Sequence, residues 1–587
     1  MISGREKRWR IREPDPASVA GLSETGLFSP FTARLLVNRG ITEPAAASRF
    51  VSAVLGDLHD PFLFSGMERA VERLVLAARK RERVCVYGDY DVDGVTAVAL
   101  LTLFFRSVGI DCFYHIPRRM EDGYGLSIDG IGSAVERGAK VIVTVDCGTT
   151  AVKEALYCRE IGADIIVTDH HMPGDDLPEA LALINPLQKG CRFPFKQPAG
   201  VGVAFNLVIA LRNRLRSAGW FAGVQEPDVR EFLDLVALGT VADMVPLLDE
   251  NRVFVKYGLT ALSTTPRIGI KALKEVAGVS GDVGSGAIGF RLAPRLNAAG
   301  RLENAALGVE LLLCEDPQRA AVLAAELDAN NAARQALEQE ILQEALAIVA
   351  NSPVYRDRKS IVLASDDWHP GVIGIVASRI VDVYHRPTVL IALQNGSGRG
   401  SARSIPGFHL YDALHACSEH LVKFGGHKYA AGLSIDEATL TSFVAQFEEI
   451  ASGLLTPSDL TPELVIDGEL HPSQISAGLV EEIRALGPFG IGNPEPSFVM
   501  RDIEVREHRL IKEHHLKLRL QAGKNRFDAI GFNLARKRGA GEGRVDIAFT
   551  LGTDGLPGRF PCQLRLKDIK ASGMASWETE VCTEQGK

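Results

Sequence analysis

The chain has 587 residues, too many for one hydrophobic core, and its length predicts three or four domains. Hydrophobic residues make up 46% of it and charged residues 24%, as in ordinary globular proteins, and no apolar run of about 18 residues suggests a membrane span. The formal net charge of −8 does not indicate nucleic-acid binding, although a local basic groove could exist. Nine scattered cysteines without a CxxC pair argue against a disulfide framework or a thiolate zinc site. The basic N-terminus lacks an apolar signal core, so we expect a cytoplasmic protein.

Helices and strands are expected to alternate regularly from about residue 65 onward. The expected strands cover 84–87, 112–116, 141–145 and 165–168, and the expected helices cover 67–81, 95–108, 128–137 and 151–161. Strands that alternate with helices of about 10–15 residues are typical of βαβ units and predict a parallel sheet. The strands are nearly continuous apolar runs, as in a sheet that is covered on both faces.

The second half of the chain changes its pattern twice. After Pro317 an Ala-rich stretch without Gly or Pro predicts a long connecting helix, and a second α/β segment follows from about 359 to 455. Beyond about residue 456, short apolar runs separated by turn residues predict strands of a small barrel. These runs are at 463–470, 498–507, 516–521, 527–532, 546–552 and 563–569. Residues before about 55 mix short helical patterns with Pro and polar residues, which predicts an N-terminal cap.

The sequence GDYDVDG, residues 88–94, brings three carboxylates into one turn between two apolar segments. They are Asp89, Asp91 and Asp93. Like charges this close repel each other, and burial strengthens the repulsion. Either solvent screens these carboxylates, or cations bind among them.

Further polar residues follow the next predicted strands. Asp146 ends one strand, the triplet Asp169, His170 and His171 ends another, and Asp243 ends a predicted helix. Taken singly, Asp146 could be a helix cap or turn former, the triplet a solvated loop, and Asp243 a structural carboxylate. Because open α/β sheets place ligands at the carboxyl ends of their strands, the joint pattern predicts one shared site.

The expected site combines four or five Asp with two His and no Cys. Carboxylates suit Mg²⁺ and Mn²⁺, and imidazole favours Mn²⁺ or Co²⁺ over Mg²⁺. Two carboxylates at positions i and i+2 can each hold a different ion, and two ions ~3.5–4 Å apart can activate water for an in-line displacement at phosphorus. The residues alone therefore predict a two-metal phosphohydrolase at the edge of a parallel sheet.

The motifs GDYDVDG, TVDCG, TDHH and the segment around Asp243 together resemble the DHH phosphoesterase superfamily in order and spacing. Further segments resemble its RecJ branch, the 5′-to-3′ exonucleases of single-stranded DNA. These segments are IPRRMEDGYGLS (116–127), RLAPRLNAAGRL (291–302), HPGVIGIVASRI (369–380), GSARSIPGFHL (400–410) and GGHKYAAG (425–432). The resemblance implies an α/β fold: a parallel-sheet DHH domain, an α/β DHH-associated domain joined to it by a long helix, and a C-terminal OB-fold β-barrel.

The expected domain boundaries follow from these patterns and from the resemblance. They are 1–55 for the N-terminal cap, 56–315 for the DHH catalytic domain, 316–352 for the connecting helix, 353–457 for the DHH-associated domain, 458–575 for the OB-fold domain and 576–587 for a tail.

The resemblance also implies a set of metal ligands. The positions that match the superfamily's ligands are Asp91, Asp93, Asp146, His170 and Asp243. In the same comparison His171 is a ligand or contacts the scissile phosphate, Asp89 joins the metal shell, and Asp169 orients its neighbours.

A terminal-phosphate pocket is implied by the segment GSARS. A hydroxyl and a guanidinium two positions apart in a Gly-flanked loop can hold a phosphate, although a solvated loop would look the same. The resemblance implies that Ser401 and Arg403 form the pocket, with Ser404 beside them and Arg119 assisting. His427 is expected at a Gly-rich turn that enters a small-residue helix, where it contacts the scissile phosphate or is structural.

Other residues are expected to contact the DNA strand. Arg295, Asn297 and Arg301 would line its path or hold two lobes together, and Arg379 would bind the substrate. In the barrel, LKLRL places Lys517 and Arg519 on one face of a strand, which suits a single-stranded backbone or is an ordinary solvated face.

We therefore expect an Mn²⁺- or Mg²⁺-dependent exonuclease, with two ions, that degrades single-stranded DNA from the 5′ end to mononucleotides in DNA repair and recombination. One alternative is a DHH phosphodiesterase for short oligonucleotides or cyclic dinucleotides, and another is a non-catalytic single-strand-binding scaffold of replication. The resemblance further implies single-strand-binding protein and a helicase as partners. We expect a monomer without a membrane association.

Overall fold

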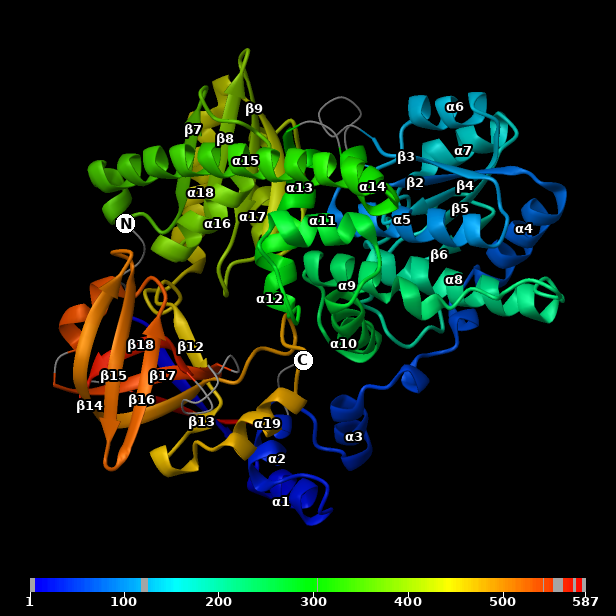
Figure 1. Ribbon diagram of the computed structural model, residues 1–587. Coiled ribbons are helices and arrows are strands. Elements are labelled where there is room, and N and C mark those ends of the chain that lie inside the picture. Colours follow the sequence, from blue (N-terminus) through cyan, green and yellow to red (C-terminus); the bar gives the residue numbers. More distant parts are fainter. Residues whose placement is uncertain are drawn as a thin grey trace. The chain divides into compact units, whose positions relative to one another are not determined.

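The computed structural model describes residues 6–117, 125–302, 305–541, 543–552, 563–573 and 577–582, and Figure 1 shows their helices and strands. The chain divides into two compact units. The first unit combines Ser48–Ala332 with Leu486–Pro494, and the second combines Met1–Ala47, Ala333–Ala485 and Glu495–Lys587. Within the described residues, no helix has the length and hydropathy that a membrane span requires.

A five-stranded sheet forms the centre of the first unit. Its order is β3-β2-β4-β5-β6, and all neighbouring strands run parallel. The strands are β2 (Arg83–Gly88), β3 (Cys112–His115), β4 (Ala139–Val145), β5 (Asp164–Thr168) and β6 (Ala182–Ile184). The predicted parallel sheet is confirmed, and β6 is a short fifth strand that the sequence pattern did not predict.

Helices cover both faces of this sheet, as Figure 1 shows for α6 and α7 on one face and α5 and α8 on the other. Along β2, Val84 and Val86 belong to the hydrophobic core on the side of α5 and α8, whereas Cys85 and Tyr87 belong to the core on the side of α6 and α7. Alternate residues of a strand point to opposite faces, so both sets are apolar. The helices are α4 (Met67–Lys80), α5 (Val92–Ser107), α6 (Ile128–Glu136), α7 (Val152–Glu160), α8 (Gly200–Ser217) and α9 (Leu233–Ala242).

Further helices complete the first unit and lead out of it. They are α10 (Asp249–Ser263), α11 (Ile268–Val276), α13 (Ala293–Leu302) and α14 (Ala306–Leu313). The predicted long helix is α15 (Pro317–Asn351), which begins in the first unit and ends in the second.

The second unit contains the predicted second α/β segment. Its sheet has the order β10-β11-β9-β8-β7, in which β7 and β8 are parallel and the other pairs antiparallel. The elements are β7 (Ile361–Ser365), α16 (Ile373–Tyr384), β8 (Thr388–Gln394), β9 (Ser397–Arg403), α17 (Leu410–Ala416), β10 (Lys423–Gly426), β11 (Ala430–Asp436) and α18 (Leu440–Leu454).

The predicted barrel is also in the second unit. Its strands have the order β13-β14-β15-β16-β18-β17, and pairing of β14 with β17 closes it, as in an OB fold. They are β13 (Gly468–Glu469), β14 (Phe498–Ile511), β15 (His515–Ala522), β16 (Asn525–Gly531), β17 (Arg544–Gly552) and β18 (Gln563–Ala571).

The two ends of the chain meet in a small sheet that differs from the sequence prediction. Strand β1 (Arg8–Pro14) runs parallel to β12 (Glu463–Ile466) on one side and to β19 (Trp577–Cys582) on the other. The run 463–470 is therefore not one barrel strand but two short strands in different sheets. The pairing brings together segments more than 400 residues apart, for example Arg8 with Glu463, and such partners leave no local pattern.

Candidate metal centre

The acidic turn at 88–94 also contains the first residues of helix α5. Helix α5 begins at Val92, earlier than the predicted residue 95, because Asp91 is its N-cap and accepts a hydrogen bond from Gly94 N at 3.1 Å. Asp93 therefore lies in the first helical turn, and it is buried together with Asp89. A Cβ atom on Gly94 would lie 2.5 Å from the carbonyl oxygen of Asp89, so only glycine fits there.

The carboxylate of Asp93 is bound by the N-terminus of another helix. Its two oxygens accept hydrogen bonds from Gly200 N (2.6 Å) and Val201 N (2.8 Å), the first residues of α8. A helix N-terminus favours negative charge. Burial and the charge of Asp91 nevertheless outweigh these bonds and raise the pKa of Asp93 to about 7.

Asp146 and Asp243 reach the same place from different elements. Asp146 follows β4 with a left-handed backbone (φ 60°), and Asp243 is the C-cap of α9. Burial and the charges of Asp93 and Asp91 raise the pKa of both carboxyls well above their ordinary value. These buried carboxylates therefore repel one another, and a bound cation would remove this repulsion.

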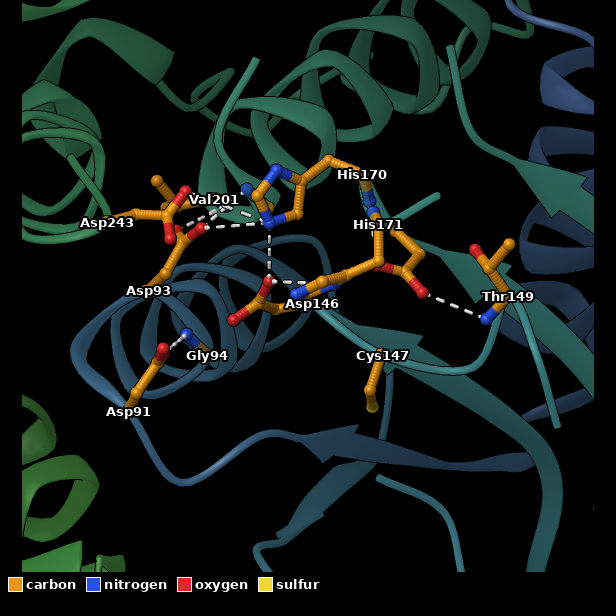
Figure 2. A network of polar contacts seen from close by, with 12 residues as sticks. Asp91, Asp93, Gly94, Asp146, Cys147, Thr149, His170, His171, Val201 and Asp243 are labelled. Atoms are coloured by element: carbon orange, nitrogen blue, oxygen red, sulfur yellow. Dashed lines mark hydrogen bonds and ion pairs between the residues drawn. The ribbon is translucent and has the colours of Figure 1, made fainter. Parts of the chain in front are cut away.

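His170 is the meeting point of the cluster (Figure 2). Its Nε2 lies 3.1 Å from Asp146 Oδ1, 3.7 Å from Asp243 Oδ2 and 3.9 Å from Asp93 Oδ2. Burial and the neighbouring charge of His171 lower the pKa of His170 to about 4, so the ring is neutral at pH 7. The backbone of Pro198 accepts a hydrogen bond from the ring. Because Nε2 has no hydrogen-bond partner in the described part of the chain, the donor is Nδ1, and the Nε2 lone pair faces the carboxylates.

Asp169 supports its two neighbours in the triplet. It accepts hydrogen bonds from the backbone amides of Thr149 (2.9 Å) and His170 (2.7 Å), and Asp169 Oδ1 lies 2.8 Å from His171 Nδ1. Burial opposes the charge on Asp169, but its hydrogen bonds and the charge of His171 lower its pKa below the ordinary value. Burial likewise opposes the charge on His171, yet the bond to Asp169 raises the pKa of His171. The arrangement fixes the orientation of His171.

The donor atoms form three overlapping groups, each with its atoms within 4.8 Å of one another. The groups are Asp146–His170–His171, Asp93–His170–Asp243 and Asp89–Asp91–Asp146. Among the residues that the structure describes, three of the atoms, Asp146 Oδ1, His170 Nε2 and Asp243 Oδ2, are buried without a hydrogen-bond partner. Buried polar atoms are normally satisfied, and this set of carboxylates and imidazoles suits Mn²⁺ or Mg²⁺. The residues therefore fit divalent cations.

Three predicted substrate-contact residues lie on α13. Asn297 Oδ1 accepts a hydrogen bond from Val92 N at 3.1 Å, so it holds the start of α5 beside the acidic turn. Arg295 pairs with Asp328 at 2.8 Å, and Arg301 is half-buried. Asn297 thus has a definite protein partner at the acidic turn.

The GSARS segment does not form the predicted Gly-flanked loop. Ser401 and Arg403 lie on the same side of strand β9, which pairs with β8 and β11. Arg403 Nη1 donates to Ser401 Oγ at 3.1 Å, and in the described ranges Arg403 has no carboxylate partner. A Cβ atom on Gly374 of α16 would lie 2.8 Å from Ser401 Oγ and 3.0 Å from Arg403 Nη2. The glycine therefore lets this helix approach both side chains.

GGHKYAAG also differs from its prediction, because it forms a β-hairpin and not a turn into a helix. His427 lies between β10 and β11, and its N–H donates to Ala430 O at 2.8 Å. Ser404 Oγ donates to Phe408 O at 2.9 Å, and Arg379 pairs with Glu338 at 3.3 Å. Arg119 lies in 118–124, outside the described residues.

The barrel strand β15 has the predicted two faces. Leu516, Leu518 and Leu520 are buried, while Lys517 and Arg519 point the other way. Arg519 pairs with Glu507 at 2.9 Å.

Sequence reasoning missed the backbone groups that orient the cluster: the amides of Gly200 and Val201 and the carbonyl of Pro198. Backbone groups carry no residue signal of their own. The only signal is the small-residue run PAGVG at 198–202, which allows a helix to begin close to the acids.

Family models match three segments of the chain. The DHH family N-terminal domain matches residues 83–240, the DHHA1 domain 357–453 and the RecJ OB domain 466–568.

Curated relatives match the chain over nearly its whole length. The single-stranded-DNA-specific exonuclease RecJ of Escherichia coli is 41% identical over 92% of this chain and 96% of its own. Its counterpart in Salmonella typhimurium is 40% identical over 96% and 99%. That of Bacillus subtilis is 38% identical over 98% and 73%.

Solved structures agree with these relatives. The crystal structure of RecJ from Thermus thermophilus in complex with Mn²⁺ has a TM-score of 0.81 at 32% identity, and covers 96% of this chain and 79% of its own. The complex with Mg²⁺ has a TM-score of 0.75 at 30% identity, with 97% and 79% covered.

Proposed function

Because the chain belongs to the RecJ family of single-stranded-DNA-specific exonucleases, we propose that its acid–histidine cluster hydrolyses single-stranded DNA from the 5′ end and releases mononucleotides. The observation that carries the proposal is the convergence of His170 Nε2 on carboxylates from three separate elements, at 3.1–3.9 Å. The match to the RecJ OB domain favours long strands over cyclic dinucleotides, and the complete cluster favours an enzyme over a scaffold.

The proposed metal ligands are Asp91, Asp93, Asp146, His170 and Asp243, with Asp89 and His171 completing the set. A pair of Mn²⁺ or Mg²⁺ ions bound there would supply an activated water and neutralise charge at the phosphate. The chain's own residues hold the ligands in place: the N-terminus of α8 holds Asp93, Pro198 orients His170, and Asp169 orients His171. Asn297 holds the helix start next to Asp91.

We assign the 5′ polarity to the pair Ser401 and Arg403. Burial lowers the pKa of Arg403, and its guanidinium lacks a carboxylate partner in the described part of the chain. A half-buried cation of this kind is stabilised by an anion, and a guanidinium beside a hydroxyl matches a terminal phosphate. Anchoring the 5′-phosphate would hold the end of the strand at a fixed position and so set the direction of cutting. Arg119, Ser404 and His427 are proposed to assist.

The remaining predicted contacts belong to the same proposal. Lys517 and Arg519 would bind the strand's phosphates on the barrel, which requires Arg519 to leave Glu507. Arg295, Arg301 and Arg379 would lie along the strand. Family membership is also the basis for proposing single-strand-binding protein and a helicase as partners, a monomeric state and a cytoplasmic location.

A digestion of a long single strand, labelled at either its 5′ or its 3′ end, tests the proposed function. With Mn²⁺ present, we expect labelled mononucleotide to appear at once from the 5′-labelled strand and only at the end of digestion from the 3′-labelled strand. Asp93→Ala should abolish turnover while strand binding stays largely intact, and Asp175→Asn, an exposed residue after the triplet, is the matched control. Early release of the 3′ label would refute the proposed polarity.

A further inference from the structure

Phe290 is the most exposed large hydrophobic side chain in the part of the chain that the structure describes. It is 86% exposed, whereas its neighbours Ile288 and Leu292 are buried. All three lie in a π-helical turn, Ile288–Leu292, that leads directly into α13. Leaving a Phe side chain in water forgoes roughly 1.5–3 kcal/mol of burial, and π-helical turns occur frequently at functional sites.

The surroundings of Phe290 are open. Cβ atoms added to Gly284, Gly286 or Gly289 would meet nothing within 4 Å. The adjacent Arg291 donates to the carbonyls of Ala277 and Gly278 and forms no ion pair within the described ranges. An exposed aromatic ring is a surface on which the bases of single-stranded nucleic acid stack.

Helix α13, which follows the π-helical turn directly, links Phe290 to the acidic turn at 88–94. Asn297 accepts a hydrogen bond from Val92 N at 3.1 Å, directly beside Asp91. Phe290 precedes Asn297 by seven residues, which corresponds to about 10 Å along a helix axis.

From these observations we propose that Phe290 stacks on a base of the single strand that the acid–histidine cluster cleaves. The inference rests on the proposed function and names a residue that would retain the strand between rounds of cleavage. Stacking uses the face of the base, which every base has, so the contact does not depend on sequence.

The test compares Phe290→Ala and Phe290→Trp with the wild type, and uses Val224→Ala, a change at another exposed hydrophobic residue of the same unit, as control. Binding of a fluorescent single strand is measured by anisotropy in EDTA, and digestion is measured with Mn²⁺. We expect Phe290→Ala to weaken binding and raise KM about 5- to 150-fold, the equivalent of ~1–3 kcal/mol per stacked base, with kcat unchanged. Phe290→Trp should restore both.

A strand with one abasic site, moved along the first six positions, provides a second readout. The wild type should lose affinity when the abasic site reaches one position, and Phe290→Ala should lose nothing further there. Equal affinities of wild type and Phe290→Ala would overturn the stacking proposal while leaving the exonuclease intact. If the wild type does not digest the strand at all, both proposals fail.

Discussion

His170 Nε2 lies 3.1 Å from Asp146 Oδ1, at the ends of the neighbouring parallel strands β5 and β4. Because burial lowers the pKa of His170 to about 4, the contact is not an ion pair at neutral pH. A neutral ring nitrogen and a carboxylate oxygen that face each other, both without a hydrogen-bond partner among the described residues, could act as two ligands of one cation.

Asp146→Asn should separate stability from metal binding. The substitution removes a buried like charge, and Asn tolerates the left-handed backbone at this position (φ 60°), so the metal-free variant should unfold at the wild-type temperature or above it. Wild type with Mn²⁺ at 100 times its Kd should gain ~2.7 kcal/mol, and the variant should gain little. Thermal unfolding in EDTA and in Mn²⁺ measures both effects. Equal stabilisation of the two proteins by Mn²⁺ would show that Asp146 is not a ligand.

Arg403→Ala should reduce the preference for phosphorylated ends. Hydrogen bonds to charged groups contribute about 1.5–3 kcal/mol, so KM for a 5′-phosphorylated strand should rise roughly 10- to 150-fold, while a strand with a 5′-hydroxyl should change little. Steady-state digestion of the two strands measures the difference. Arg484→Ala removes an exposed arginine of the same unit and serves as control. Equal losses on both strands would contradict a terminal-phosphate pocket.

The sequence predicted that these acids and histidines converge, because the residues follow strands whose apolar pattern is local. Parallel strands end at one edge of a sheet, so Asp93, Asp146 and His170 could be brought together without coordinates. The amides of Gly200 and Val201 that hold Asp93 could not be predicted, since a backbone N–H has no identity in the sequence.

The glycines of GSGRGSARS explain why a strand was predicted as a loop. A Cβ atom on Gly398 would lie 2.7 Å from Ile391 Cγ2, and one on Gly400 would lie 2.6 Å from Leu433 Cδ1. These glycines allow close packing of neighbouring strands, and turn flexibility is not their role. Glycine alone does not distinguish the two situations, because the distinction depends on the partner strands.

Glu250 lies outside the acid–histidine cluster and should make the free energy of unfolding depend on pH. Its buried carboxylate accepts hydrogen bonds from His59 N (2.8 Å) and Asn206 Nδ2 (3.0 Å), yet burial raises its pKa from 4.5 to about 7. Because the pKa of Glu250 is higher in the folded state, its protonated carboxyl stabilises the fold fully below pH 4.5. This stabilisation is lost as the pH rises to about 7.

Glu250→Gln cannot ionise, so its stability relative to the wild type should rise between pH 4.5 and about 7 and then level off, by about 3 kcal/mol in total. Urea unfolding in EDTA across this range measures the difference. Hydrogen bonds changed by the amide give an offset that does not vary with pH. The exposed Glu136→Gln is the control, and a flat difference for Glu250→Gln would contradict the buried-acid interpretation.

Arg252 should hold the segment Leu486–Pro494 against the rest of the first unit. Its side chain is buried and donates to the carbonyls of Phe50 (2.6 Å), Leu486 (3.0 Å) and Gly487 (2.7 Å). Nearby, Leu247 N donates to Ile491 O at 2.7 Å. One planar guanidinium thus satisfies carbonyls from two distant segments.

Arg252→Met keeps the aliphatic stem but leaves these carbonyls without a donor, at about 1–3 kcal/mol each, so the segment should open more often. Amide hydrogen exchange of residues 244–252 and 486–494 should accelerate at least ~10-fold, the equivalent of ~1.4 kcal/mol. Arg252→Lys should fall between the two, because an ammonium group lacks the planar fork of donors. Lys271→Met removes an exposed charge from the same unit without these contacts and should leave exchange unchanged. Unchanged exchange in Arg252→Met would mean that the segment is held by its other contacts, among them the bond from Leu247 to Ile491.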